Sequence, residues 1–471
     1  MKPLDVTMSR VSGALTVVFG MLLGFPLLPT ALRWPARVAV LCALAWLAFA
    51  LVRGLRRVKW SAKGVVFSGV LLALMFAATH LLCFVFMKVM GARDDRLALR
   101  GELTLTPGGR EQAERLVAGG VGEGGFHPRI GWVPHAGQTM PGTTVSKQGI
   151  RATREYPAVP LERDKRVLCM GDSFTFGVGV TDGQTYPHHA EELKPGWEWL
   201  NFGIPGACLT QACLHYMENA RKFDGKYVVI GFMTNDAQRT VNCYRPFVNR
   251  TSGMAMTKPF AFIDDAGNFD IKPNPYTSID DYRRLLADPT AELRALLRQD
   301  YLTWGRGGRQ VVLENPVVRT FLYAGNQLRI PVKLEALLNN SVPVRPLFKM
   351  LAAGDLYGDE FWAEDSKGFR ALCGMFDFFH STVIKDGRIP LIAIIPGPHD
   401  IDDFKRGDPR QYETLLRFLK QRGYRHLDFL DTLLAKHRDD LSEQALFVVR
   451  HYQGQVNREL AQEIVKALQL P

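Results

Sequence analysis

Strand-like and helical segments alternate between residues 166 and 233, and this alternation most constrains what the chain can fold into. The expected strands are Arg166–Met170, Trp197–Phe202 and Tyr227–Met233, and the expected helices between them are Tyr186–Leu193 and Cys208–Lys222. Tyr227–Met233 is almost entirely apolar, which is typical of a strand that is buried on both faces. The pattern therefore predicts an α/β fold in which helices cover a parallel sheet.

The alternation resumes after residue 388. Pro390–Ile395 predicts a fourth strand, Gln411–Arg422 a helix, His426–Leu430 a short strand and Asn457–Leu468 a closing amphipathic helix. These elements extend the same sheet and its covering layers.

Residues of about 240–388 form an insertion between these two parts. Phe260–Ile271 predicts a hairpin whose turn is Asp264–Asn268, and Ala291–Leu302 and Val332–Leu338 predict helices. Loops at strand ends often surround a site, but the sequence does not decide whether this insertion shapes one or only decorates the fold.

The positive charge of the chain is concentrated before residue 100. The net charge is +11, and residues 1–100 hold 13 Lys and Arg against 3 Asp and Glu, a balance of +10. The remaining +1 leaves no basic stripe for DNA or RNA, so we expect no nucleic-acid partner. The basic residues flank three apolar runs, Val11–Leu28, Val38–Val52 and Val65–Met87, each near the roughly 20 residues that cross a bilayer.

We therefore expect residues 1–90 to form about three transmembrane helices, residues 91–125 a linker, and residues 126–471 one α/β domain with the insertion. The loop Arg53–Lys63 is the more basic of the two and should be cytoplasmic. Three spans then place the α/β domain outside the cytoplasm, at the plasma (inner) membrane. Two spans would leave it inside.

A serine follows the first expected strand on a turn built from Gly171 and Asp172. A serine hydroxyl is held in the open where a strand ends on such a turn, which is what a nucleophile needs. A strand-to-helix turn in which Asp172 or Ser173 caps a helix explains the same residues without any chemistry. Three later segments favour the chemical interpretation.

These segments supply a base and hydrogen-bond donors. Gly206 follows the second strand and can offer a backbone N–H, Asn235 follows the third strand and can offer its amide, and His451 precedes the last helix. An activated serine needs a base, and the oxyanion of its tetrahedral product needs hydrogen-bond donors. The N–H of Ser173 itself would be a third donor, besides those of Gly206 and Asn235. We see no metal-ligand spacing and no phosphate-binding loop, so no metal or cofactor is expected.

The four segments resemble the conserved blocks of the SGNH hydrolases, also called the GDSL esterase and lipase superfamily. Ser173 matches the nucleophile of the first block, Gly206 the glycine of the second, Asn235 the asparagine of the third and His451 the base of the fifth. Residues 128–132 and 148–151 resemble the lead-in of bacterial membrane-anchored members. The resemblance implies a three-layer α/β/α sandwich and an enzyme that deacylates or transacylates esters, often acetyl groups on polysaccharides.

The chain departs from the family pattern at Val448 and Thr234, where members usually have Asp and Gly. The missing Asp matters more, because losing the acid of a triad can cost on the order of 10⁴ in rate. Two arrangements can replace the acid: a backbone carbonyl that holds His451 in a Ser–His dyad, or another carboxylate, Asp400 or Asp431, that reaches it. We favour either of these over the third interpretation, a degenerate site in a binding or assembly protein of the cell envelope.

Overall fold

The computed structural model describes residues 105–119, 125–247, 254–264, 266–300 and 361–470, which belong to one compact unit. The three apolar runs and the helix expected at Val332–Leu338 lie outside the described residues. Within the described part, no helix combines the length and apolar character needed to cross a bilayer.

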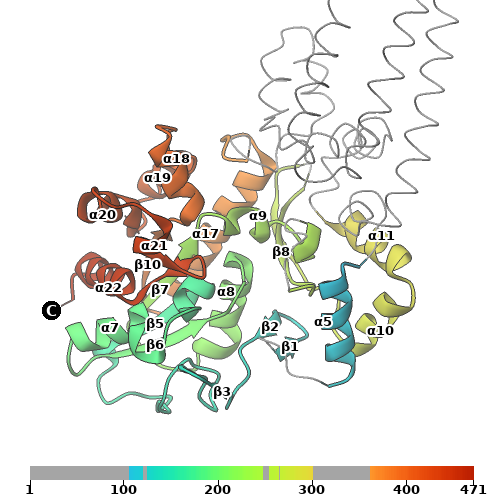
Figure 1. Cartoon of the computed structure of the whole chain (residues 1–471), viewed down its shortest axis with the longest axis horizontal. Coiled ribbons are helices and arrows are strands. Elements are labelled where there is room, and N and C mark those ends of the chain that lie inside the picture. Colours follow the sequence, from blue (N-terminus) through green and yellow to red (C-terminus); the bar gives the residue numbers. More distant parts are fainter. Residues whose placement is uncertain (1–104, 120–124, 248–253, 265, 301–360, 471) are drawn as a thin grey trace, which may run out of the picture. The chain divides into compact units, whose positions relative to one another are not determined.

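A five-stranded parallel sheet forms the centre of this unit (Figure 1). Its spatial order is β11-β10-β7-β5-β6, with β5 (Arg166–Gly171), β6 (Glu198–Gly203), β7 (Tyr227–Met233), β10 (Ile389–Ile395) and β11 (His426–Asp428). Every residue of β5 and β7 is buried, because apolar side chains fill both of their faces. The predicted α/β fold with a parallel sheet is confirmed.

Helices cover both faces of the sheet (Figure 1). One layer holds α7 (Tyr186–Leu193), α20 (Phe429–Lys436) and α22 (Gly454–Leu468), and the other holds α8 (Leu209–His215), α17 (Lys367–Lys385) and α19 (Glu413–Gln421). This division follows from right-handed crossovers, in which the direction of travel along the sheet fixes the face that the connecting helix covers. The chain moves one way from β5 to β6 and the other way from β6 to β11, so the connecting helices lie on opposite faces.

Several expected boundaries differ from the structure. The helix expected at Cys208–Lys222 is α8 followed by a wider helical turn, Tyr216–Ala220. The strand expected at His426–Leu430 stops at Asp428, because the side chain of Asp428 caps α20 by accepting the N–H of Leu430. Helix α17 was not expected and lies inside the predicted insertion.

The prediction that residues 91–125 form a linker needs correction, because helix α5 (Pro107–Val117) lies within this range. Thr106 caps this helix, since its Oγ1 accepts the N–H of Gly109 at 2.8 Å. The helix packs against α10 (Ile279–Ala287), which itself precedes α11 (Pro289–Gln299), the helix expected at Ala291–Leu302. An N-cap and a packing partner thus order part of a segment that the sequence suggested was a stalk.

The remaining elements are short. The expected hairpin is confirmed as β8 (Phe260–Ile263) and β9 (Phe269–Lys272). The other pairs and single turns are β1 (Gly125–His127), β2 (Gly131–Val133), β3 (Thr139–Met140), β4 (Thr143–Thr144), β12 (Phe447–Val448), β13 (His451–Tyr452), α6 (Ser173–Phe176), α9 (Asp236–Thr240), α18 (Pro398–Lys405) and α21 (Glu443–Leu446), with 3-10 turns at Arg163–Lys165, Asp182–Gln184 and Arg245–Phe247.

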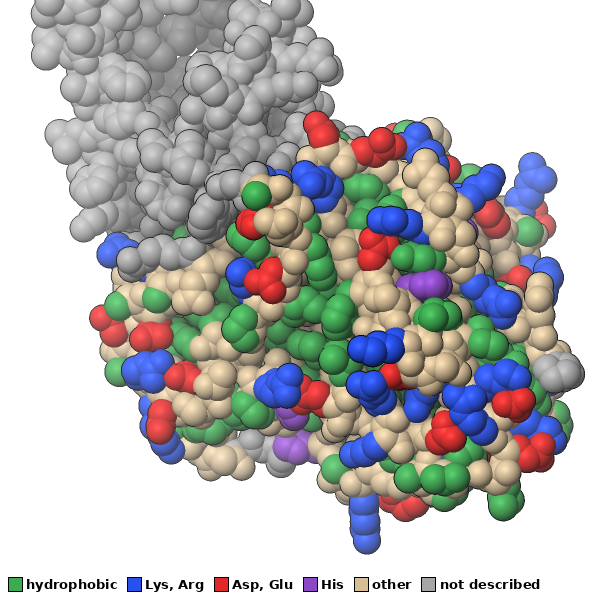
Figure 2. All heavy atoms as spheres, turned by 180° about the vertical axis from the view of Figure 1, so that it is seen from behind, with side chains coloured by type: hydrophobic (Ala, Val, Ile, Leu, Met, Phe, Trp, Pro, Cys, Tyr) green, Lys and Arg blue, Asp and Glu red, His purple; other side chains and the backbone are tan. Residues whose placement is uncertain are grey.

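Acidic and basic side chains are interspersed on the face shown in Figure 2. This mixture agrees with the near balance of charge after residue 100, where the net charge is +1. The strong positive charge of the sequence therefore belongs to its first hundred residues and not to this face.

Candidate active site

Ser173 lies where β5 ends, at the first residue of the one-turn helix α6. Gly171 has φ +151°, and a Cβ there would lie 2.2 Å from Thr175 Oγ1, so only glycine fits. Asp172 caps α6, because its Oδ1 accepts the N–H of Phe174 at 2.8 Å. This turn holds Ser173 at the rim of the sheet, with its own N–H in the first turn of a helix, where it has no intrahelical acceptor.

His451 meets Ser173 although 278 positions separate them in the sequence. Its Nε2 lies 2.8 Å from Ser173 Oγ, and its Nδ1 lies 2.8 Å from the carbonyl oxygen of Val449. A carbonyl oxygen only accepts, so Nδ1 carries the hydrogen and Nε2 is free to accept from the serine hydroxyl. This is the tautomer that a general base for serine requires.

A strained turn places the carbonyl of Val449. The two residues between β12 and β13, Val449 and Arg450, have φ of +48° and +62°. Two-residue hairpin turns with positive φ at both positions normally hold Asn and Gly, and a β-branched residue is an outlier there. Backbone strain of this kind is typical of functional sites.

The surroundings of His451 keep its imidazole neutral at pH 7. Burial lowers the pKa of His451 below its ordinary value of 6.5, and the nearby Arg239 and Arg245 lower it further, while the Val449 carbonyl and Asp236 raise it. A neutral imidazole is the form that accepts a proton.

The two carboxylates that we expected near His451 are engaged elsewhere. Asp400 accepts the hydroxyl of Thr234 at 2.6 Å and the N–H of Gly397 at 2.7 Å. Asp431 is exposed and pairs with Arg410. The structure therefore does not bring Asp400 or Asp431 to Nδ1, where the Val449 carbonyl already lies.

Gly206 and Asn235 follow strands whose carboxyl ends flank that of β5. Strands β6 and β7 pair with β5 on its two sides and in parallel register, so the residues after all three strands share one edge of the sheet. Between β5 and β7 the connections run in opposite directions, which is where α/β folds form their binding crevice. Asn235 is exposed, and its side chain does not cap α9.

Two side chains hold the loop of Gly206. Trp132 Nε1 donates to the carbonyl of Pro205 at 2.9 Å, and that carbonyl belongs to the same peptide group as the N–H of Gly206. Arg245 Nη1 donates to the Gly206 carbonyl at 2.6 Å. Gly206 has φ +70°, and a Cβ there would lie 1.9 Å from Arg245 Nη1. Trp132 lies in a stretch noted for its resemblance, whereas no sequence signal pointed to Arg245.

Arg151 fixes the far end of α6. Its buried guanidinium donates to the carbonyls of Phe176, Gly177 and Val180, and its Nε pairs with Asp182 at 3.0 Å. The carbonyls of Phe176 and Gly177 lie at the end of the helix that begins with Ser173, where they have no partner within the helix. The sequence placed Arg151 in the lead-in stretch but gave it no role.

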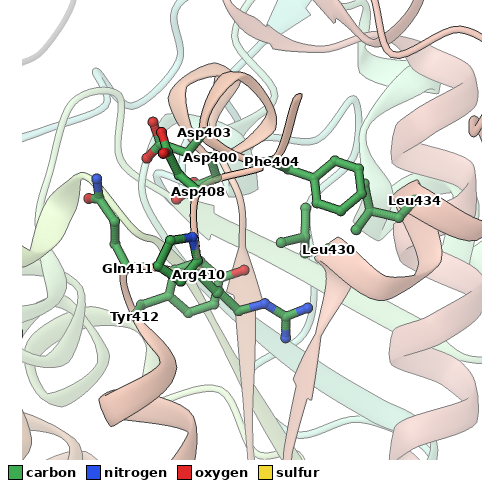
Figure 3. A pocket seen from close by; sticks show the side chains of 10 residues that line it. Asp400, Asp403, Phe404, Asp408, Arg410, Gln411, Tyr412, Leu430 and Leu434 are labelled. Atoms are coloured by element: carbon green, nitrogen blue, oxygen red, sulfur yellow. The ribbon is translucent and has the colours of Figure 1, made fainter. Parts of the chain in front are cut away.

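A cavity of about 150 Å³ lies beside Asp400, with acidic side chains toward one side and apolar ones toward the other (Figure 3). It is lined by Asp400, Asp403, Phe404, Asp408, Pro409, Arg410, Gln411, Tyr412, Leu430 and Leu434, a set that excludes Ser173 and His451. In the part of the chain that the structure describes, no group of three or more His, Cys, Asp or Glu side chains is placed to hold a metal ion. We assign this cavity no role in the Ser173 site.

No protein-family model and no curated protein matches the chain. It is similar to a solved structure described as a lipolytic protein of the G-D-S-L family from Desulfitobacterium hafniense DCB-2, with 11% identity, a TM-score of 0.29, and 64% of this chain and 99% of that one covered. A G-D-S-L family lipolytic protein from Veillonella parvula DSM 2008 gives 11% identity, a TM-score of 0.29, and 64% and 98% coverage.

Proposed function

We propose that this chain is a serine esterase of the SGNH, or GDSL, superfamily in which Ser173 and His451 form a catalytic dyad. The observation that carries the proposal is the 2.8 Å contact between Ser173 Oγ and His451 Nε2, with Nδ1 held by a carbonyl. The sheet order and the two helical layers support it, because they fit the three-layer, flavodoxin-like sandwich that the resemblance implies.

The reaction follows from the tautomer. Ser173 Oγ attacks the ester carbonyl carbon while its proton passes to His451 Nε2. The oxyanion accepts hydrogen bonds from the N–H groups of Ser173 and Gly206 and from the amide of Asn235, each worth on the order of 10²–10³ in rate. When the C–O bond breaks, the leaving alkoxide takes the proton from His451, and water or a sugar hydroxyl then attacks the acyl-enzyme.

The Val449 carbonyl replaces the missing acid in one of its two roles, which is to fix the tautomer of His451. Replacing the acid of a triad by an amide costs on the order of 10⁴ in rate because the imidazole then adopts the wrong tautomer. A carbonyl cannot donate, so it enforces the correct one. It stabilises the imidazolium less than a carboxylate would, since it carries only a partial charge. The dyad should therefore be active but slower than a full triad.

The proposed setting is the cell envelope. Three apolar runs with basic flanks support a multi-pass anchor in the plasma membrane with the esterase domain outside the cytoplasm. The family resemblance supports an acylated carbohydrate or small molecule as substrate, with hydrolysis or transfer to an acceptor hydroxyl as the outcome.

Labelling with a fluorophosphonate tests the dyad, because this probe phosphonylates only activated serines. We expect the purified full-length wild type to be labelled and to hydrolyse p-nitrophenyl acetate. Ser173→Ala should abolish both, and His451→Ala should reduce both by at least 10³. Ser381→Ala, which changes an exposed serine on α17, is the matched control and should be labelled like the wild type.

One residue, Val448, at the position of the family's acid, favours a second function. In this alternative the chain is a binding or assembly protein of the cell envelope that keeps the fold without the activity. A folded wild type that takes up no probe, together with binding of envelope polysaccharide, would support this second function and overturn the first.

A further inference from the structure

Two buried carboxyl groups meet beside the nucleophile. Asp172 immediately precedes Ser173 at the end of β5, and Asp236 immediately follows Asn235 at the end of the neighbouring β7. Each is 2% exposed, and the two side chains lie close enough for each to shift the pKa of the other. Two negative charges held side by side away from water repel each other, so this arrangement favours the state in which one of the pair keeps its proton.

The other partners of the pair show where that proton resides. Asp236 forms an ion pair with Arg239, one turn further along α9. Asp172 accepts only the backbone N–H of Phe174 through Oδ1, while its buried Oδ2 meets no N–H or O–H donor among the described residues. The carboxyl with a cation is the one that ionises, and the carboxyl without one keeps the hydrogen.

The surroundings favour this assignment. Burial raises the pKa of Asp172 well above its ordinary value, and the neighbouring Asp236 raises it further. Burial also raises the pKa of Asp236, but Arg239 and the hydrogen bond from Asp172 lower it. The charged and titratable groups that face the pair, from all elements packed against it, are Arg239, Arg245, Lys258, Tyr186, His451 and Tyr452.

We propose that Asp172 is a neutral carboxylic acid whose O–H donates to the Asp236 carboxylate, and that this proton keeps negative charge away from the N–H of Ser173, where the oxyanion forms. The inference rests on the proposed function. An ionised Asp172 would place a charge one residue from the oxyanion in buried surroundings, where screening is weak, and would repel it. Asp172 is thus a positioning residue, because its cap shapes the turn and its proton sets the local charge.

Infrared difference spectroscopy tests the proton directly and needs no activity. The full-length wild type at pH 7 should show the carbonyl stretch of a protonated carboxylic acid, shifted in D₂O, that is missing from Asp172→Asn. If that variant does not fold, Asp236→Asn takes its place: an amide that donates to Asp172 lets that carboxyl group ionise, so the same band should be missing from this variant. Its absence from the wild type at pH 7 overturns the proposal.

The rate of fluorophosphonate labelling tests the consequence. Asn at position 172 still accepts the N–H of Phe174 and still donates to Asp236, so Asp172→Asn should label within about threefold of the wild type, whereas Asp172→Ala should fall about 30-fold. As the pH rises past the raised pKa of Asp172, labelling of the wild type should decline and that of Asp172→Asn should not. An Asn variant as impaired as the Ala variant overturns the proposal.

The two proposals fail in different ways. A wild type that shows the infrared band but takes up no probe refutes the esterase function and leaves the shared proton standing. A wild type that takes up the probe but lacks the band refutes the shared proton and leaves the dyad standing.

Discussion

At the scale of single residues, the candidate site replaces a side-chain acid with a main-chain oxygen. His451 keeps a partner on each ring nitrogen, Ser173 Oγ on one and the Val449 carbonyl on the other. The orientation of the base is therefore preserved, and the charge that would stabilise its cation is reduced. Both consequences can be measured through the pH dependence of the reaction.

The first prediction concerns the acidic limb of the pH profile. The base acts as the neutral imidazole, so activity is present above the pKa of His451 and lost below it. Burial lowers that pKa below 6.5. We therefore expect the acidic limb of kcat/KM for an uncharged ester to be centred below pH 6.5. A limb centred at or above pH 6.5 would contradict the geometry.

The second prediction restores the acid. Val448 pairs directly with His451 across the β12–β13 hairpin, so their side chains are neighbours. A carboxylate in Val448→Asp should stabilise the imidazolium, raise the pKa of His451 and move the acidic limb of kcat/KM to higher pH. Val448→Asn, which has the same shape without the charge, is the control and should leave the limb in place. Equal profiles for both variants would refute this electrostatic account.

At the scale of elements, turns at the ends of strands set the direction of three groups in the site. The helix α6 aims Ser173, the β12–β13 turn aims His451, and the loop after β6 carries Gly206. Each turn needs a backbone conformation that few residues adopt, and each is held by a buried side chain or a short hydrogen bond. Substitutions in two of these turns have opposite expected effects.

The third prediction is a gain of stability in the β12–β13 turn. Val449 has φ +48° and is 73% exposed, so Val449→Asn relieves backbone strain and loses little packing. We expect the free energy of unfolding to rise by about 1 kcal/mol. Val159→Asn is the matched control, because Val159 is 74% exposed without positive φ, and it should give no gain. Denaturant unfolding of the three proteins measures both effects.

The fourth prediction is a loss at Gly206. Its φ of +70° strains any other residue, and a Cβ would lie 1.9 Å from Arg245 Nη1. Gly206→Ala should therefore lower both the stability and the labelling rate, the latter by about tenfold or more through displacement of the Gly206 N–H. Gly196→Ala is the control, since Gly196 has φ +84° with no atom within 4 Å of a Cβ. It should cost about 1 kcal/mol of stability and leave labelling unchanged.

At the scale of the whole molecule, the described residues and the first hundred have different chemistry. The described unit is a helix-covered sheet with mixed charge, whereas residues 1–100 combine three apolar runs with a balance of +10. This division is the one that the proposed membrane anchor requires. The placement of the domain then depends on how many of the runs insert.

The fifth prediction is that the full-length chain is an integral membrane protein. It should sediment with membranes and resist extraction with alkaline carbonate, because apolar runs of this length leave the bilayer only at high cost. With three spans, a tag at the C-terminal end should be digested by protease added to spheroplasts. A carbonate-soluble chain would contradict the anchor, and a membrane-bound chain with a protected tag would show the two-span arrangement.

The parallel sheet and the candidate site residues could be predicted from the amino-acid pattern alone. Buried strands read as apolar runs because both of their faces pack, and Ser173, Gly206, Asn235 and His451 are recognisable because each follows a predictable strand or precedes a predictable helix. The long helix α17 was not predicted, since the local sequence pattern does not show where an insertion rejoins the fold. Helix α5 was not predicted either, because its stability depends on packing against α10.

The groups that complete the site are visible only in the folded protein. Asp400 and Asp431 were chosen from their positions near strand ends, yet their hydrogen bonds go to Thr234, Gly397 and Arg410. The partner of His451 is a carbonyl, and every residue has one, so no sequence pattern can single it out. The shared proton of Asp172 and Asp236 likewise arises only when folding sets two strands side by side, because a carboxyl group changes its ionisation in response to its neighbours in space and not along the chain.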